Sequence, residues 1–351
     1  MDIKGDNILF LLGAGASFDA NIPISDKMVG KIEELINQDD EWKQYKHLYN
    51  YLKSSIQYGD GILGKFDEPF NVERLLIVIS EIEKRDANIM YPFIGTWNIR
   101  LTDLAGDDFE NLTALKKLIV NKLNDWVRLK NYDAAGYYQG FINLKNEIGN
   151  LLRVFTLNYD LCFERVVGKE NEVELGFNSS TKEWHYTNFD SLEGKDFFLY
   201  KLHGSINWYI DDSKNSKLLV SDDPVDVPEL IFGIQHKMKS NDPYFYYSSE
   251  FRKLSLERDT KLIICIGYSF SDEYINNILT QATLEKDEVR ILAVIGPKGQ
   301  AEDQKKSIEE KLKINPDSLI VETTGAKEFL SNTLNKEYLA QYISDSEEAP
   351  F

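Results

Sequence analysis

The 351-residue sequence contains only two cysteines, Cys162 and Cys265, each inside an apolar segment. No C-x-x-C pair exists, which excludes a zinc site built on cysteine, and both thiols are expected to be small buried groups. Apolar runs long enough to span a membrane are absent. So is the basic and then apolar N-terminal segment of a signal peptide. We therefore expect a reduced, cytoplasmic protein.

Basic side chains are also scarce relative to acidic ones. Lys and Arg number 40 against 58 Asp and Glu, and the formal net charge is −18. Contacts with phosphate groups need a cationic surface, so we expect neither nucleic acid nor a membrane surface as a partner. The chain is 42% hydrophobic, and at this length it can bury a large core divided between subdomains.

A glycine turn follows the first apolar run. Residues 8–12 read as a buried strand of a parallel sheet, and the small residues GAGAS at 13–17 then allow a sharp turn and a close ligand approach. With a following helix, such a turn predicts a dinucleotide site. Phe18 stands where the usual G-x-G-x-x-G fingerprint has its third glycine. A tight turn without a ligand is therefore the alternative.

Three later apolar segments also end in polar residues. Residues 151–160 end with Asn158 and Asp160, residues 197–208 contain His203, and residues 260–273 contain the turn Gly267-Tyr268-Ser269. Open parallel sheets place ligand groups at the carboxyl ends of their strands, and a histidine there suits a general base. Helix caps and turns at Asn158 and Asp160, and a loop hydrogen bond at His203, are the alternatives.

The domain prediction is an α/β domain with a helical insertion. Residues 1–39 and 151–345 are expected to form a Rossmann-like parallel sheet with helices on both faces, and residues 346–351 a mobile acidic tail. Residues 40–150 carry apolar side chains at helical spacing and predict an all-helical insert, with GDG at 59–61 as a break. Its aromatic residues are expected in a core, or alternatively against a partner subunit.

Finer expectations concern caps and short segments. Ser25 is expected to cap a helix over 26–37, and Ser271 or Asp272 a helix over 273–285. Residues 211–228 are polar and predict an excursion from the sheet, and a short strand is expected at 230–232.

The order of GAGAS, LNYD, KLHGS and IGYSFSD resembles the sirtuin (silent information regulator) superfamily. There a GAG-x-S loop, a T-x-N-x-D strand end, an HG strand end and a G-x-S loop surround one NAD+. Ile22-Pro23 is similar to the I-P of the family's cofactor-binding loop, and PELIFG at 228–233 to a segment downstream of the catalytic His. Two features of protein-deacylating sirtuins are missing: the D-F-R after the I-P and the four-cysteine zinc module.

The helical insert is similar to that of sirtuin-like effectors in bacterial anti-phage systems, which degrade NAD+. The resemblance implies an NAD+ glycohydrolase without zinc that depletes NAD+ in defence. It also implies a homo-oligomer and a partner chain such as a DNA-translocating ATPase. An NAD+-dependent protein deacylase, a non-catalytic sensor of NAD+ or ADP-ribose and a plain nucleotide-binding scaffold are the alternatives.

The resemblance also assigns roles to residues. His203 would remove a proton from water or a ribose hydroxyl, Asn158 would orient the ribose or the water, and Asp160 would stabilise positive charge or position the nicotinamide amide. Backbone N–H groups of the GAGAS turn would hold the pyrophosphate. The residues assigned to cofactor binding are Gly13, Ala14, Gly15, Ser17, Pro23, Thr156, Gly267 and Ser269.

Overall fold

A computed structural model of the chain describes residues 3–66, 69–84, 98–211, 213, 216–230, 242–297 and 301–343. The chain divides into two units, which we call the sheet unit (Met1–Ile22 and Arg128–Phe351) and the helical unit (Pro23–Val127). The boundaries differ from the predicted 39/40 and 150/151. The helix after Pro23 packs on the helices that follow it, whereas residues after Arg128 pack on the sheet.

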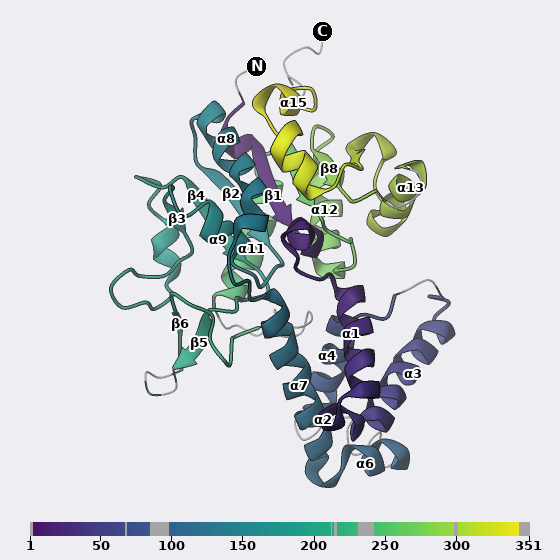
Figure 1. Cartoon of the computed structure of the whole chain (residues 1–351). Helices are drawn as coiled ribbons and strands as arrows, with labels where there is room; N and C mark the ends of the chain where they lie inside the picture. The colour runs from purple at the N-terminus through teal and green to yellow at the C-terminus, as the bar shows by residue number, and fades with distance from the viewer. Residues whose placement is uncertain are drawn as a thin grey trace. The chain divides into compact units, whose positions relative to one another are not determined.

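The sheet unit is built on seven parallel strands, as the predicted Rossmann-like class requires (Figure 1). The order across the sheet is β3 (Val173–Glu174), β4 (Phe197–Lys201), β2 (Leu152–Thr156), β1 (Ile8–Leu12), β7 (Leu262–Ile266), β8 (Arg290–Val294) and β9 (Leu319–Glu322). A separate antiparallel ribbon pairs β5 (Trp208–Asp211) with β6 (Lys217–Val220). The predicted excursion at 211–228 is therefore partly a hairpin.

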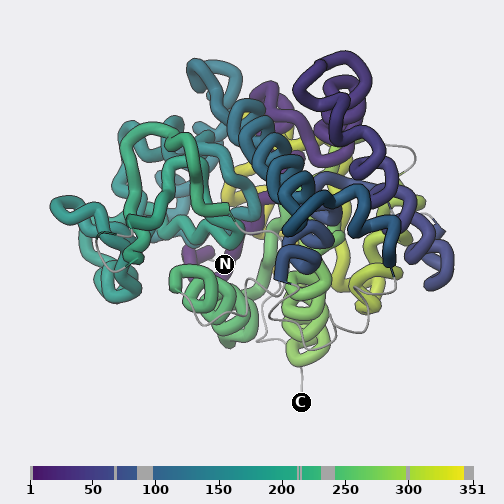
Figure 2. Tube along the Cα trace, turned by 90° about the horizontal axis from the view of Figure 1, so that it is seen from below, coloured from purple at the N-terminus to yellow at the C-terminus, as the bar shows by residue number. Residues whose placement is uncertain are grey.

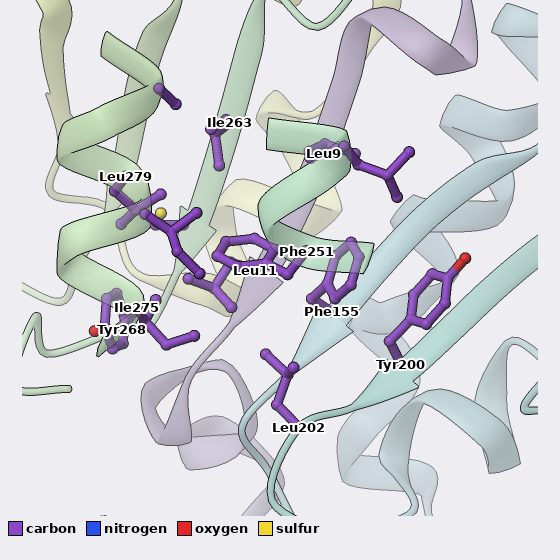
Figure 3. Packing of buried hydrophobic residues seen from close by; sticks show 14 of the residues in the cluster. Leu9, Leu11, Phe155, Tyr200, Leu202, Phe251, Ile263, Tyr268, Ile275 and Leu279 are labelled. Atoms are coloured by element: carbon purple, nitrogen blue, oxygen red, sulfur yellow. The ribbon is translucent and has the colours of Figure 1, made fainter. Parts of the chain in front are cut away.

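Helices cover both faces of the sheet because side chains alternate along each strand. Leu9 and Leu11 of β1 join a buried cluster with α11 and α12, where Figure 3 places Phe251 and Leu279. Phe10 points to the other face and packs edge-on against Phe141 of α8, with ring centroids 5.1 Å apart. Both faces are thus buried, and the continuous apolar runs of the strands are explained.

The helices of the sheet unit connect the strands. The α-helices are α8 (Gln139–Ile148), α9 (Cys162–Val166), α11 (Tyr244–Leu256), α12 (Glu273–Glu285), α13 (Ala301–Leu312), α14 (Ala326–Glu328) and α15 (Lys336–Ala340). The 3₁₀ segments are η1 (Gly5–Asn7), η2 (Ala14–Ala20), η5 (Asp133–Tyr138), η6 (Tyr186–Phe189) and η8 (Pro316–Ser318), and η9 (Phe329–Thr333) is a π-helix. The helix predicted at 273–285 matches α12.

The helical unit consists of α1 (Ser25–Gln38), α2 (Asp40–Lys43), α3 (Lys46–Ile62), α4 (Val72–Glu83), α6 (Ile99–Ala105), η4 (Asp107–Phe109) and α7 (Glu110–Val127). Figure 2 shows them in purple to blue, and α1 packs on α2 and α4 while α4 packs on α7. Two predictions here are wrong. Ser25 begins α1 without a side-chain cap, and the GDG at 59–61 lies inside α3, where Asp60 pairs with Arg74 at 2.5 Å.

Among the described residues, no helix combines the length and the apolar character that crossing a membrane requires. Of the strand expected at 230–232, only Leu230 is described, and it forms an isolated bridge with Gly204. Residues 231 and 232 and the tail at 346–351 lie outside the described residues.

Candidate functional site

Four neighbouring strands bring the four polar segments to one edge of the sheet. Leu12 of β1 is in register with Thr156 of β2 and with Ile266 of β7, and Thr156 is in register with Lys201 of β4. The segments that follow therefore leave the sheet at the same level and on the same side. The chain order reverses between β1 and β7, and such a switch point is where open α/β sheets bind ligands.

The two glycine turns at this edge lie directly against each other. The N–H groups of Gly13 and Gly15 donate to the carbonyl oxygens of Ile266 and Gly267, both at 2.9 Å. A Cβ atom on Gly13 would lie 2.6 Å from Gly267 O, and one on Gly267, whose φ is +63°, would lie 2.1 Å from Ala16 N. Glycine is required here because the two backbones touch. We expected the N–H groups of Gly13 and Gly15 to bind pyrophosphate. In this conformation both groups instead donate to carbonyl oxygens of the neighbouring turn.

The remaining residues of the turns differ in exposure. Ala14 and Ser269 are exposed at the sheet edge, whereas Ser17 is fully buried. The 3₁₀ helix η2 (Ala14–Ala20) begins within the turn itself. Of the residues predicted to bind the cofactor in these turns, Ala14 and Ser269 are thus exposed, Gly15 and Gly267 are half-buried, and Ser17 faces the interior.

Asn158 is held from two directions. Its side-chain Nδ2 donates to Ser17 Oγ at 3.2 Å, and its backbone N–H donates to Thr156 Oγ1 at 3.0 Å. Ser17 Oγ also lies 2.9 Å from the hydroxyl of Tyr138. Asn158, Thr156 and Ser17, three residues predicted for the site, thus form one buried hydrogen-bonded group.

The side chain of Asp160 takes part in a local turn, which was the alternative to a catalytic role. Its Oδ1 accepts the backbone N–H of Cys162 at 2.9 Å, at the start of α9. Its carbonyl oxygen accepts from Lys201 Nζ at 2.5 Å, and Lys201, which is 0% exposed, also pairs with Glu164 at 2.8 Å. A buried charge needs such partners. Through them Lys201 connects the end of β4 to the loop after β2.

His203 lies beside an acidic side chain from the far side of β1. Its Nε2 is 3.4 Å from Asp272 Oδ2. Asp272 Oδ1 accepts the N–H groups of Tyr274 and Ile275, so the predicted cap of α12 is confirmed for Asp272. The ring of Tyr159 lies 6.2 Å from the imidazole. The carboxylate of Asp272 therefore lies beside the imidazole of His203.

Burial favours the neutral forms of the Tyr138 hydroxyl and the Cys162 thiol. Desolvation raises the pKa of Tyr138 well above its usual value, and the Asp160 carboxylate raises it further. Burial and then Asp160 likewise raise the pKa of the Cys162 thiol. The cluster therefore carries hydrogen-bonding groups without added negative charge. Within the described ranges, no three His, Cys, Asp or Glu side chains are grouped to hold a metal ion.

The sequence analysis did not predict that Tyr138 and Lys201 belong to this site. It also did not predict that Asp272 lies beside His203. Asp272 carried a signal, because it was a candidate cap, but a cap does not predict a second contact. Tyr138 and Lys201 carried none. Pro23 opens the helical unit, and its role in cofactor binding stays a prediction.

Comparison with known proteins gives one family. Residues 152–316 match the family described as the SIR2-like domain. Among solved structures, one entitled "Structure of Sir2Tm bound to a propionylated peptide" aligns over 96% of this chain and 94% of that chain, at 13% identity and a TM-score of 0.36. A search of curated protein sequences finds no match.

The matched residues contain the ends of β2, β4 and β7, and so include Asn158, Asp160, His203, Gly267 and Ser269. Sirtuin-like proteins use NAD+, so the match supports an NAD+-dependent function. Over residues 152–316, somewhat less than half of its length, the chain is similar to the SIR2-like domain.

Proposed function

We propose that the chain hydrolyses NAD+ to nicotinamide and ADP-ribose, or to a cyclised product. The observation that carries the proposal is the common register of Leu12, Thr156, Lys201 and Ile266. This register gathers the amide of Asn158, the imidazole of His203 and the exposed Ala14 and Ser269 at one sheet edge. The reaction needs a group that orients the nucleophile, a general base and a surface that binds the dinucleotide.

The chemistry is the displacement of a good leaving group. The bond between the ribose anomeric carbon and the nicotinamide nitrogen breaks, and its electron pair neutralises the positive charge of the pyridinium ring. A water oxygen forms the new bond to the anomeric carbon. His203 accepts the proton that the water loses and passes it to solvent. For the cyclised product, a nucleophilic group of the ADP-ribose moiety replaces the water.

The other side chains act by position and charge. Asn158 orients the water or a ribose hydroxyl. It can do so because its hydrogen bond to Ser17 restricts the direction of its amide. Asp160 supplies negative charge close to Tyr138 and Cys162, and this charge stabilises the oxocarbenium-like centre that develops on the ribose. Asp272 holds the imidazole of His203.

Product analysis tests the reaction. Purified protein is incubated with NAD+, alone and with its candidate partner, and the products are identified by mass. We expect nicotinamide and ADP-ribose, and a loss of about 100-fold or more in nicotinamide release for Asn158→Ala and for His203→Ala. His185→Ala is the matched control, because His185 is an exposed histidine of the sheet unit and should retain full activity.

Three outcomes contradict the proposal. Full activity in His203→Ala would remove its role as the base. Nicotinamide release only in the presence of an acylated lysine peptide would identify a deacylase. Tight binding of NAD+ without turnover in every assembly state would identify a sensor.

We further propose that the activity serves anti-phage defence by NAD+ depletion and is controlled by assembly. Unregulated NAD+ hydrolysis is toxic, so an active site requires a switch. A homo-oligomer or a separate partner chain supplies the switch, and the helical unit is the segment that we assign to this contact. Mass measurement of the protein alone and with candidate partners checks this, and an inert monomer under all conditions contradicts it.

A further inference from the structure

Two adjacent tyrosines reach the GAGAS turn from the end of η5. The hydroxyl of Tyr137 donates to the carbonyl oxygen of Ala16 at 2.6 Å, and the hydroxyl of Tyr138 lies 2.9 Å from Ser17 Oγ. Both tyrosines are buried, with 7% and 1% of their surface exposed. They come from a part of the chain separated from the turn by 121 residues, yet they end in different kinds of contact.

Only the Tyr138 contact continues to a side chain at the end of β2. Ser17 Oγ accepts from Asn158 Nδ2 at 3.2 Å, so the three groups form a chain from Tyr138 through Ser17 to Asn158. Ser17 is 0% exposed and Asn158 is 8% exposed. In a buried chain of this kind each group limits the orientation of the next, because an unmade hydrogen bond is costly.

The hydrogen bonds from Tyr138 through Ser17 determine the orientation of the Asn158 amide. Its backbone is already held by Thr156 Oγ1, so rotation of the amide is the freedom that remains. With Nδ2 directed to Ser17, the carbonyl oxygen Oδ1 is the atom presented to a substrate. An acceptor oxygen suits a water or a ribose hydroxyl, both of which can donate a proton to it.

The hydroxyl of Tyr138 is suited to this task and is not needed for packing. Its ring packs against Tyr137, Phe141 and Phe163, with centroids 5.1, 6.0 and 6.4 Å away. A phenylalanine would make the same ring contacts. Burial and then Asp160 raise the pKa of Tyr138 above its usual value, which favours the neutral hydroxyl.

We propose that Tyr138 is a positioning residue, whose hydroxyl orients Ser17 and thereby the amide of Asn158 for reaction. The inference rests on the proposed role of Asn158 in NAD+ cleavage. It adds a residue outside the strand-end motifs and assigns the orientation of a catalytic amide to the η5 segment.

The test compares two matched variants, Tyr138→Phe and Tyr137→Phe. Each removes one buried hydroxyl that contacts the same turn, so both are expected to lower the thermal stability to a similar degree. Tyr138→Phe should lower kcat for NAD+ about tenfold while KM stays within about twofold, because the loss of one hydrogen bond affects the transition state more than substrate binding. Tyr137→Phe should keep kcat within about twofold.

A double variant examines whether Tyr138 acts through Ser17. If it does, Tyr138→Phe should add no further loss of kcat in a Ser17→Ala background. Losses that multiply, or full kcat in Tyr138→Phe, would overturn the inference.

A measurement without NAD+ separates this inference from the proposed function. With asparagine labelled by ¹⁵N, the Asn158 side-chain amide signal is assigned by its loss in Asn158→Ala. Its protons should exchange about tenfold faster in Tyr138→Phe than in wild type and unchanged in Tyr137→Phe. An unchanged exchange rate in Tyr138→Phe contradicts the positioning role, whereas a wild-type protein that leaves NAD+ intact contradicts the proposed function alone.

Discussion

At the scale of single residues, the glycines of the two turns allow two strand ends to touch. The sequence pattern suggested that Gly13 and Gly15 offer their N–H groups to phosphate, but both groups are used between the turns. The same residue type serves a different purpose because the contact partner, Gly267, lies some 250 positions further along the chain. Spacing alone could not distinguish these two uses of glycine.

Gly267 is a position of the site where an added methyl group should strongly destabilise the protein. Its φ of +63° and a Cβ placed 2.1 Å from Ala16 N predict that Gly267→Ala lowers the free energy of unfolding by more than about 2 kcal/mol. Gly296→Ala is the control, since no atom of the described residues lies within 4 Å of its added Cβ, and it should change stability little. Urea unfolding measures both, and equal stabilities would contradict the close approach of the two turns.

At the scale of elements, local patterns predicted the four strands whose ends form the site and the helix α12, but not every helix of the sheet unit. The apolar runs at β1, β2, β4 and β7 were recognised because both faces of each strand are buried. The two-residue β3, the helices α11 and α13 and the end of η5 were not. Helices α11 and α13 pack on β4 and β9, and these contacts form only in the tertiary structure.

Helix α1 offers a test of local helix propensity at an exposed position. Gly30 lies in the exposed middle of the helix, and an added Cβ there meets no atom of the described residues within 4 Å. Gly30→Ala should therefore raise the free energy of unfolding by about 0.5–1 kcal/mol, because alanine loses less backbone entropy in a helix.

Chemical denaturation followed by circular dichroism measures the Gly30 effect. Gly106→Ala should act in the opposite direction, since φ at Gly106 is +78° and its added Cβ would lie 2.8 Å from Asn111 Nδ2. A destabilised Gly30→Ala protein would mean that this face of α1 is covered.

At the scale of the whole molecule, charge constrains the choice of partners. The net charge of −18 produces a field that repels polyanions at low ionic strength. A partner is therefore expected to recognise the chain through protein surfaces, even if that partner itself acts on DNA.

Direct binding of DNA should accordingly be absent. In a titration of a labelled duplex at about 50 mM salt, we expect no saturable change in anisotropy up to about 10 µM protein. A basic DNA-binding protein serves as the positive control. Binding that weakens steeply as salt rises would contradict the expectation and indicate a local basic surface.

The sequence by itself determined the class of the fold and the segments that form the sheet edge. Apolar runs that end in GAGAS, LNYD, KLHGS and IGYSFSD are local features, and parallel strands necessarily bring their carboxyl ends together. Tertiary structure decided what each polar group does there. Whether Lys201 holds the carbonyl oxygen of Asp160, whether Ser17 faces a phosphate or Tyr138, and which acid lies beside His203 all depend on contacts between distant parts of the chain. Such contacts arise when the strands pair and the helices pack, so no local spacing in the sequence specifies them.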